Sequence, residues 1–338
     1  MAFEVVPYDS SRLPGVLALM RDVWGEWMTE EEFAWWFDAS PGGPATISLA
    51  ETEGRVVGMV GVSYYRARIG GEDRLLPVPV HGATHVSARG QGIFETLARE
   101  NARHAQAQGG SLELGFPNDA AHPVWVKRVG WQDVAPIRLW ARPLRPVAAI
   151  RALRGRAAAP PFGLRPPSVE ARRYGSVEVR PLARAPSETD ELGQLAAAGY
   201  PNHILRSAAH LNWRFADAPR DYRLFGAYRG GRLTGLAVVG HKLHRGVSTG
   251  FVADLVASPG AFAETRALLR RALAEVRGGA DALAAALPPP TTQRSAFFSL
   301  GFLPTPLTIR AAGRALPDGP LPTEARDWYF ALGDTDFF

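Results

Sequence analysis

The sequence repeats itself about halfway along its length. Three short stretches recur in the same order: WWFDASP (35–41) and WRFADAP (213–219), GRVVGMV (54–60) and GRLTGLAV (231–238), and KRVGW (127–131) and FSLGF (298–302). The first pair is 178 residues apart and the second pair 177, so both fit one alignment with a single-residue slip. Paired landmarks in register predict two copies of one fold rather than one large domain.

The repeat sets the domain organisation that we expect for the 338 residues. The copies occupy residues 1–145 and 177–312, and residues 146–176 join them as a linker rich in Pro, Ala and Arg. Prolines in this linker forbid a continuous helix or a central strand. Residues 313–338 are too few to fold alone, so we expect this tail to dock on the copies.

Composition excludes several classes of protein. The chain has no cysteine, which excludes disulfides and thiolate metal sites, and 46% of its residues are hydrophobic, as a globular core requires. No apolar run is long enough for a membrane span, and the first residues do not resemble a signal peptide, so we expect a cytoplasmic protein. The net charge of +5 fits a nucleic acid or a phosphorylated cosubstrate as partner. Because the arginines are dispersed or lie in the linker, we expect no nucleic-acid or membrane partner.

Hydrophobic spacing predicts alternating strands and helices within the first copy. Strands are predicted at 3–8, 45–51, 56–69, 75–86, 111–116 and 137–144, and helices at 12–27, 29–40, 91–107 and 121–131. Thr29 and the acidic residues after it suit a helix start, and Gly130 suits a helix end. The pattern predicts an α/β (α+β) fold, with a mixed sheet flanked by helices.

A glycine-rich turn lies between a predicted strand and a predicted helix of the first copy. It reads Arg89-Gly90-Gln91-Gly92 and opens the helix directly. Glycine lets a backbone approach a ligand closely, and the first amides of a helix are unpaired and carry partial positive charge. Such a turn is typical of a phosphate-binding loop. The alternative is an ordinary flexible helix start, which two glycines would weaken without any packing gain.

The first copy resembles the GNAT superfamily of acyl-CoA-dependent N-acyltransferases. The GNAT signature, Gln/Arg-x-x-Gly-x-Gly/Ala at the start of the third helix, is similar to residues 89–94, RGQGIF, except that Phe94 replaces the last small residue. An Asn after the fifth strand (Asn118) and a Gly-aromatic pair closing the next helix (Gly130-Trp131) also fit. The resemblance implies two GNAT-like domains, each with a mixed, mostly antiparallel sheet flanked by helices.

The resemblance also implies a cosubstrate and the residues that bind it. The cosubstrate is acetyl-CoA or another acyl-CoA, and no metal is expected. The diphosphate would be held by the amides of Arg89, Gly90, Gln91, Gly92, Ile93 and Phe94. The backbone of Ala83, Thr84 and Val86 would pair with the pantetheine arm like an added strand, and Asn118 would lie near the thioester.

The second copy differs at the same place. Its corresponding stretch is FVADLVASPGAFAETRALLRRAL, in which Pro259-Gly260 replaces the glycine-rich run. Proline has no amide donor, and the second glycine is missing. We therefore expect the second copy to be degenerate and to bind CoA poorly or not at all.

Two residues of the first copy are candidates for the general base that takes a proton from the amine. These are His81 on the fourth strand and Glu113 on the fifth. Each has an alternative structural role, as a hydrogen-bonded strand histidine and as a solvated face residue. The tyrosine that often serves as acid in the family is missing, since its place falls at Trp125 or Val126. At the chain end, Phe338 could place a carboxylate in the site, although a docked structural tail is the simpler interpretation.

These features predict an acyl-CoA-dependent N-acyltransferase whose first domain is active. We expect it to transfer an acetyl group from acetyl-CoA to an amine of a small polar acceptor. One alternative is a non-catalytic protein that binds acyl-CoA or another ligand, which the missing tyrosine favours. Another is a transferase that takes aminoacyl groups from tRNA. The positive charge permits it, and the glycine-rich turn at residues 89–92, which we call the CoA-type loop, disfavours it. The sequence does not identify the acceptor or the oligomeric state.

Overall fold

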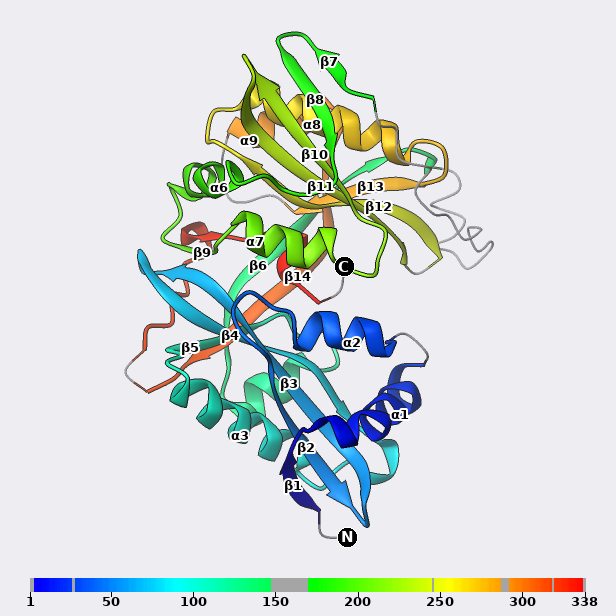
Figure 1. Ribbon diagram of the computed structural model, residues 1–338, viewed down its shortest axis with the longest axis vertical. Helices are drawn as coiled ribbons and strands as arrows, with labels where there is room; N and C mark the ends of the chain where they lie inside the picture. The colour runs from blue at the N-terminus through cyan, green and yellow to red at the C-terminus, as the bar shows by residue number, and fades with distance from the viewer. Residues whose placement is uncertain are drawn as a thin grey trace. The chain divides into compact units, whose positions relative to one another are not determined.

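The computed structural model describes residues 3–25, 28–146, 170–244, 246–286, 292–317 and 319–336 (Figure 1). The chain forms two compact units, one of Met1–Ala135 with Arg310–Thr323 and the other of Pro136–Ile309 with Glu324–Phe338. Most of the predicted linker, and Phe338, lie outside the described residues. In the described part of the chain, no helix is long and apolar enough to cross a membrane.

The first unit contains an antiparallel sheet with the strand order β1-β2-β3-β4. Its strands are β1 (Glu4–Pro7), β2 (Thr46–Thr52), β3 (Arg55–Ile69), β4 (Glu72–Thr84) and, separately, β5 (Leu112–Gly115). Its helices are α1 (Leu13–Trp24), α2 (Glu30–Phe37), α3 (Ile93–Ala107) and α4 (His122–Val124), which continues as a π turn, η3 (Trp125–Val129). The 3-10 turns η1 (Ser10–Arg12) and η2 (Val86–Ala88) precede α1 and α3. The order of elements predicted from the sequence is confirmed.

Local sequence explains where these elements begin and end. Thr29 accepts a hydrogen bond from the Glu32 amide while the Glu32 side chain accepts one from the Thr29 amide, a capping box that starts α2. Gly130 has a φ of 86° and ends η3. The hairpin between β3 and β4 turns at Gly70-Gly71, whose φ angles of 62° and 84° favour glycine.

Helices cover both faces of the first sheet, as alternate residues of β3 show. Val60 and Val62 pack with side chains of α3. The residues between them face the other layer: Gly61 lies against the Phe37 ring of α2, and the Ser63 hydroxyl accepts a hydrogen bond from Trp36 Nε1 at 3.0 Å. A period of two along a strand therefore separates an α3 face from an α1/α2 face.

The second unit repeats this arrangement. Its strands are β7 (Arg172–Tyr174), β8 (Val177–Leu182), β10 (Arg223–Arg229), β11 (Arg232–His244), β12 (Val247–Ala257) and β13 (Ala282–Ala286). Its helices are α6 (Thr189–Ala197), α7 (Ala208–Leu211) with the π turn η4 (Asn212–Ala216), α8 (Phe262–Val276) and α9 (Thr292–Ser299). A short parallel pair, β9 (Asn202–Ile204) and β15 (Trp328–Tyr329), and the turns η5 (Ala325–Asp327) and η6 (Leu332–Asp334) complete it. The predicted fold class, two mixed and mostly antiparallel α/β domains, is confirmed.

Two long strands each contribute to both units. Strand β6 (Gln132–Pro143) starts in the first unit, and its end pairs antiparallel with β13 of the second. Strand β14 (Leu303–Ala315) starts in the second unit, and Ala312–Ala315 pair antiparallel with β5 of the first. Each unit thus contains part of the last strand of the other copy. The sequence-based limits at 145 and 312 follow the repeat and do not anticipate this exchange.

Candidate functional site

A β-bulge shapes the end of β4. Met59 pairs with Ala83 and Gly61 with Val80, so His81 and Gly82 together face the single residue between Met59 and Gly61. His81 has a φ of 51°, in the left-handed region. A Cβ atom at Gly82 would lie 2.7 Å from the Phe94 ring, so only glycine fits there. The bulge bends β4 shortly before the strand ends at Thr84, and bulges are common next to functional sites.

The strand end beyond the bulge has one edge without a strand partner. In the described part of the sheet, β4 forms a ladder only with β3. The His85 amide donates to the Val57 carbonyl at 2.9 Å, so the neighbouring peptide groups of Thr84 point the other way. The Thr84 carbonyl accepts a weak hydrogen bond from Arg89 Nε at 3.3 Å. Thr84 Oγ1 is buried and has no hydrogen-bond partner among the described residues. An extended ligand could pair with this edge.

The turn after β4 has the geometry of an anion-binding loop. Gly90 and Gly92 have φ angles of 81° and 77°, and Gly92 is the N-cap of α3. A Cβ at Gly90 would meet nothing within 4 Å, so the glycine is required by conformation and not by packing. The backbone amides from Gly90 to Phe94 donate to no carbonyl in the described part of the chain. They are free to bind an anion at the positive end of the helix.

Charges around the loop are compatible with an anion. Glu95, in the first turn of α3, accepts a hydrogen bond from Arg128 at 2.8 Å, and this bond lowers the pKa of the Glu95 carboxyl. Arg128 thereby neutralises the carboxylate nearest the helix start. Arg89 and Gln91 are exposed, whereas Ile93 is buried and fixes the helix start in the core.

Phe94, which departs from the family pattern, contributes to packing. Its ring lies against Gly82 and 5.0 Å from the Trp125 ring, which in turn stacks on Trp131 at 4.0 Å. The backbone amide of Phe94 nevertheless keeps its position in the first turn of α3. The larger side chain is accommodated by the glycine of the bulge, and the amide cradle is retained.

Asn118 forms a turn between β5 and α4. Its Oδ1 accepts hydrogen bonds from the amides of Ala120 at 3.1 Å and Ala121 at 2.9 Å. The residue is exposed. These bonds fix the start of α4 and leave only the Nδ2 group available for a ligand.

His81 lies at the bulge within an aromatic cluster. It is buried, and its ring centroid lies 5.2 Å from that of Trp36, 5.5 Å from Phe37 and 6.4 Å from Trp24. Trp24 is 41% exposed, so the cluster reaches the surface. The imidazole therefore lies on the α1/α2 face, two residues before the strand end expected to bind pantetheine.

Glu113 lies on the opposite face, in a buried ion pair. Its Oε2 accepts a hydrogen bond from Arg314 Nε at 2.7 Å, and Arg314 also donates to the Val129 carbonyl at 3.1 Å. Burial raises the pKa of the Glu113 carboxyl, and the Arg314 charge opposes that rise. Val129 belongs to η3, so Glu113 faces the α3 layer, whereas His81 faces α1 and α2. The structure separates the two candidate bases.

Sequence reasoning missed the partners of both candidates. Arg314 is 201 residues from Glu113 and reaches it only because β14 pairs with β5. The aromatic cluster around His81 comes from two helices whose tryptophans fit an ordinary apolar face. His122 precedes a proline at a helix start, which predicts a cap, but its Nε2 instead lies 2.6 Å from Asp133 Oδ1.

Comparisons with known proteins agree with this geometry. Residues 4–134 match the family model of the acetyltransferase (GNAT) domain. A GCN5-related N-acetyltransferase from Anabaena variabilis superposes with a TM-score of 0.65 at 11% identity, over 93% of this chain and 72% of that one. Myristoyl-CoA-bound N-myristoyltransferase from Saccharomyces cerevisiae superposes with a TM-score of 0.62 at 13% identity, over 97% and 84%.

A third structure extends the same likeness. A probable N-acyltransferase from Enterococcus faecalis has a TM-score of 0.64 at 10% identity and covers 96% of this chain and 74% of its own. At such identities the structures show a shared fold over both units. No curated protein matches the sequence.

Proposed function

We propose that this chain, whose residues 4–134 match the family model of the acetyltransferase (GNAT) domain, is an acyl-CoA-dependent N-acyltransferase with its active site in the first unit. The observation that carries the proposal is the run of free amides from Gly90 to Phe94 at the start of α3. Two left-handed glycines shape this loop, and the turn η2 connects it to the end of β4, whose outer edge has no strand partner among the described residues. An extended pantetheine arm needs a strand edge with which it can pair. The diphosphate needs free amides close to that edge.

The residues present fit the cosubstrate. Amides from Gly90 to Phe94 would hold the diphosphate, with Arg89 beside them. The outward peptide group of Thr84 would pair with the pantetheine arm, and the buried Thr84 hydroxyl would gain a partner. Val86 lies in the turn η2, where its carbonyl already accepts a hydrogen bond from the Arg89 amide at 3.4 Å. Asn118 Nδ2 would face the thioester end. Binding at these points would fix the thioester carbonyl for attack, and most of the rate would come from this positioning.

His81 is the base that we favour. In the reaction the amine nitrogen bonds to the thioester carbonyl carbon, the carbon–sulfur bond breaks, and CoA leaves as the thiol. His81 would take the proton of the attacking amine, directly or through water. Glu113 remains a candidate, but its hydrogen bond to Arg314 favours a structural role. Trp24, half-exposed beside His81, would contact the acceptor, which we expect to be a small polar amine.

The acyl group is proposed to be acetyl. The matching family model is that of acetyltransferases, which supports a short acyl chain. The similar N-myristoyltransferase is described with bound myristoyl-CoA, so chain length has to be measured. Rates with acetyl-, hexanoyl- and myristoyl-CoA would decide it, and we expect acetyl-CoA to give the highest kcat/KM.

The proposal is tested by CoA binding to Gly90→Ala and Gly92→Ala variants. Each adds a Cβ at a positive φ, which strains an L-residue by about 1–2 kcal/mol and moves the loop amides. Gly71→Ala is the matched control, because Gly71 also has a positive φ and open space around it but lies in the β3–β4 turn. We expect the loop variants to lose CoA affinity at least tenfold and the control to keep it. Equal affinity in all three would refute the proposed site.

Turnover is tested separately by thiol release. The chain has no cysteine, so a thiol reagent reports only the CoA that is set free. We expect release that depends on an added amine. CoA binding without release across a broad amine panel would favour the alternative of a non-catalytic ligand-binding protein.

A further inference from the structure

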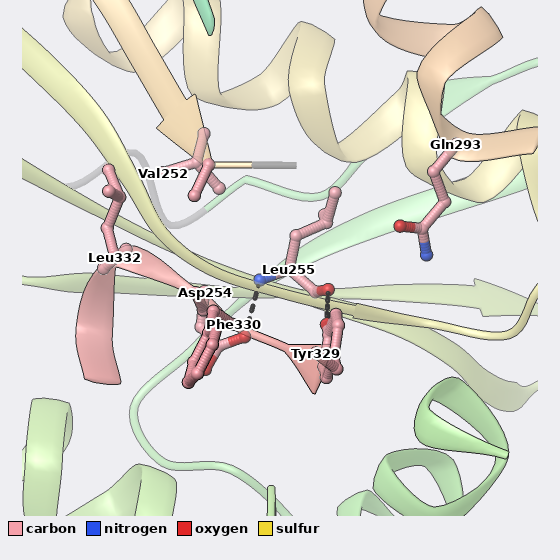
Figure 2. Close-up of a pocket in the computed structure, with 10 residues that line it drawn as sticks. Val252, Asp254, Leu255, Gln293, Tyr329, Phe330 and Leu332 are labelled. Carbon is pink, nitrogen blue, oxygen red and sulfur yellow. Dashed lines mark hydrogen bonds between the residues drawn. The ribbon is translucent and has the colours of Figure 1, made fainter. Parts of the chain in front are cut away.

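The end of β12 in the second unit borders a pocket. Strands β12 and β13 pair in parallel only as far as Val252 with Ala285. A bulge on β12 follows, because Val238 pairs with Asp254 and Val239 with Val252. Beyond it, residues of β12, Ala286 and Gln293 line a pocket together with residues 329–332 (Figure 2). In the order of elements this place corresponds to the end of β4 in the first unit.

The C-terminal segment forms one side of this pocket and packs on the end of β12. The Tyr329 hydroxyl donates to the Leu255 carbonyl at 2.6 Å (Figure 2), and Trp328 and Tyr329 pair in parallel with Asn202 and His203 of β9. Gly333 lies so close that a Cβ would be 2.4 Å from the Phe215 ring and 3.2 Å from the Ala253 carbonyl oxygen. The segment therefore contacts the bulge itself.

Two buried arginines hold the segment. The Arg206 guanidinium lies 2.6 Å from Asp334 of the segment and 3.3 Å from Asp254 of β12, and all three side chains are at most 1% exposed. Its carbon also lies 4.7 Å above the Tyr329 ring centroid. Arg214 donates to the carbonyls of Gly333 at 3.1 Å and Thr335 at 3.0 Å. Charge-assisted hydrogen bonds in a dry site are strong, and losing one partner leaves a buried charge uncompensated.

The start of α8 lacks the amide cradle of the first unit. The Ala261 amide donates to the Ser258 carbonyl at 2.9 Å, and the Phe262 amide donates to the Gly260 carbonyl at 2.8 Å. Pro259 contributes no amide at all. Two of the amides at this helix start are thus already used within the turn, and a third position has no amide to offer.

We propose that the second unit is a peptide-binding domain whose ligand is the chain's own segment Trp328–Thr335, and that this segment closes the unit to acyl-CoA. The groove recognises a run of three aromatic residues, Trp328 to Phe330, followed four residues later by the carboxylate of Asp334. Arg206 binds that carboxylate, and β9 pairs with the backbone of Trp328 and Tyr329. The comparison of this groove with an acyl-CoA groove rests on the function proposed for the first unit. The packing of the segment Trp328–Thr335 in the second unit does not rest on it.

A single introduced cysteine tests occupancy, because the chain contains none. Ala331 is 6% exposed within the pocket, so we expect the thiol of an Ala331→Cys variant to react with a thiol reagent at least 100-fold more slowly than that of Ser187→Cys, an exposed control. Comparable rates in a folded chain, checked by circular dichroism, would overturn the proposal.

A second substitution tests recognition by Arg206. Adding Asp334→Asn to Ala331→Cys removes the carboxylate that Arg206 binds, and we expect labelling to accelerate at least tenfold. Asp327→Asn removes an equal charge whose nearest cation, Arg326, is 3.9 Å away, and it should leave the rate unchanged. Equal rates in the two double variants would contradict the role of Arg206.

Titration with CoA completes the test. We expect one CoA per chain in the wild type. Two would contradict closure of the second unit. No binding, combined with slow labelling of the Ala331→Cys variant, would reject the function proposed for the first unit and leave the peptide groove standing.

Discussion

Strand β4 of the first unit and strand β12 of the second both end after a bulge, but the two strand ends have different surroundings. In the first unit the bulge at His81-Gly82 is followed by a strand edge without a partner and by free amides at Gly90–Phe94. In the second, the bulge near Ala253 meets the chain's own Gly333, and two amides at the start of α8 donate to carbonyls of the preceding turn. Under our two proposals, the same place in the fold binds a cosubstrate in the first unit and a peptide segment in the second. We assign the difference between the units to the turns at residues 89–92 and 258–261 and to the segment Trp328–Thr335.

Each unit also contains a buried group of paired charges. Glu113 and Arg314 pair in the first unit, while Arg206 lies between Asp254 and Asp334 in the second. Both sets join strands or segments that are remote in sequence. Buried pairs of this kind are poor evidence for added stability, but breaking one leaves a costly lone charge. We therefore assign them to holding the exchanged strand and the tail in register.

The largest effect that we predict is on the chemistry of the first unit. His81→Asn keeps a residue that tolerates the left-handed φ of 51° and removes the imidazole. We expect kcat to fall about 10²–10⁴-fold with little change in the KM for acetyl-CoA, as for loss of a general base. Steady-state thiol release measures both constants.

A paired variant serves as control for the other candidate base. Glu113→Gln with Arg314→Gln removes both charges of the buried pair together, so neither is left alone. We expect this protein to keep kcat within about threefold of the wild type, in line with the small cost of replacing a pair as a unit. A large loss of kcat in this double variant, together with an unchanged kcat in His81→Asn, would make Glu113 the general base and His81 a structural residue.

The next effect concerns the loops themselves. Replacing residues 89–92 of the first unit, RGQG, by residues 258–261 of the second, SPGA, transfers a turn that is known to start a helix in this fold. We expect the affinity for CoA to fall about 100-fold, or about 3 kcal/mol, because the free amides are lost. Isothermal titration calorimetry measures it.

The reverse exchange sharpens the comparison. Placing RGQG at 258–261 restores the glycines of the second unit but leaves the segment Trp328–Thr335 in its groove. We expect no second CoA to bind. A gain of binding would show that the loop alone, and not the tail, keeps the second unit closed.

The smallest effect that we predict is a pH dependence of the second unit. Burial lowers the pKa of His210 to about 3, with help from Arg206 and Arg214. Unfolded histidine takes up a proton near pH 6.5, so the stability that neutral His210 provides is complete above that pH and is lost as the pH falls. Asp254, whose pKa burial raises to about 6, has the opposite sign, because its burial costs less as the pH falls.

The variant His210→Asn isolates one of these two groups. Relative to the wild type, its free energy of unfolding should rise by about 2 kcal/mol between pH 7 and pH 5. Urea unfolding at the two pH values gives the difference. A difference that stays constant with pH would show that His210 is not held neutral in the folded protein.

Local features of this molecule could be predicted from sequence, and long-range ones could not. The capping box at Thr29, the glycine turn at Gly90-Gly92 and the strands of the first copy depend on residues a few positions apart, and all are found. The repeat also reports the tandem fold correctly. Pairing of β14 with β5 depends on which edges are left free once both sheets have formed, and no local pattern encodes that.

The same distinction applies to the candidate site. The CoA-type loop is contiguous, so its residues could be named in advance. The surroundings of His81 and Glu113 come from remote segments, and the ion pair with Arg314 depends on the strand exchange. His203 and His210, seven residues apart, would share a face only on one helix, but His203 lies in β9 and His210 in α7.

A crystal structure of the chain with CoA tests the central claim most directly. We expect the diphosphate oxygens within about 3 Å of amides between Gly90 and Phe94, and the pantetheine arm along Thr84, with the segment Trp328–Thr335 unmoved in the second unit. A nucleotide bound at the start of α8 with that segment displaced, or bound away from α3 altogether, would contradict the account.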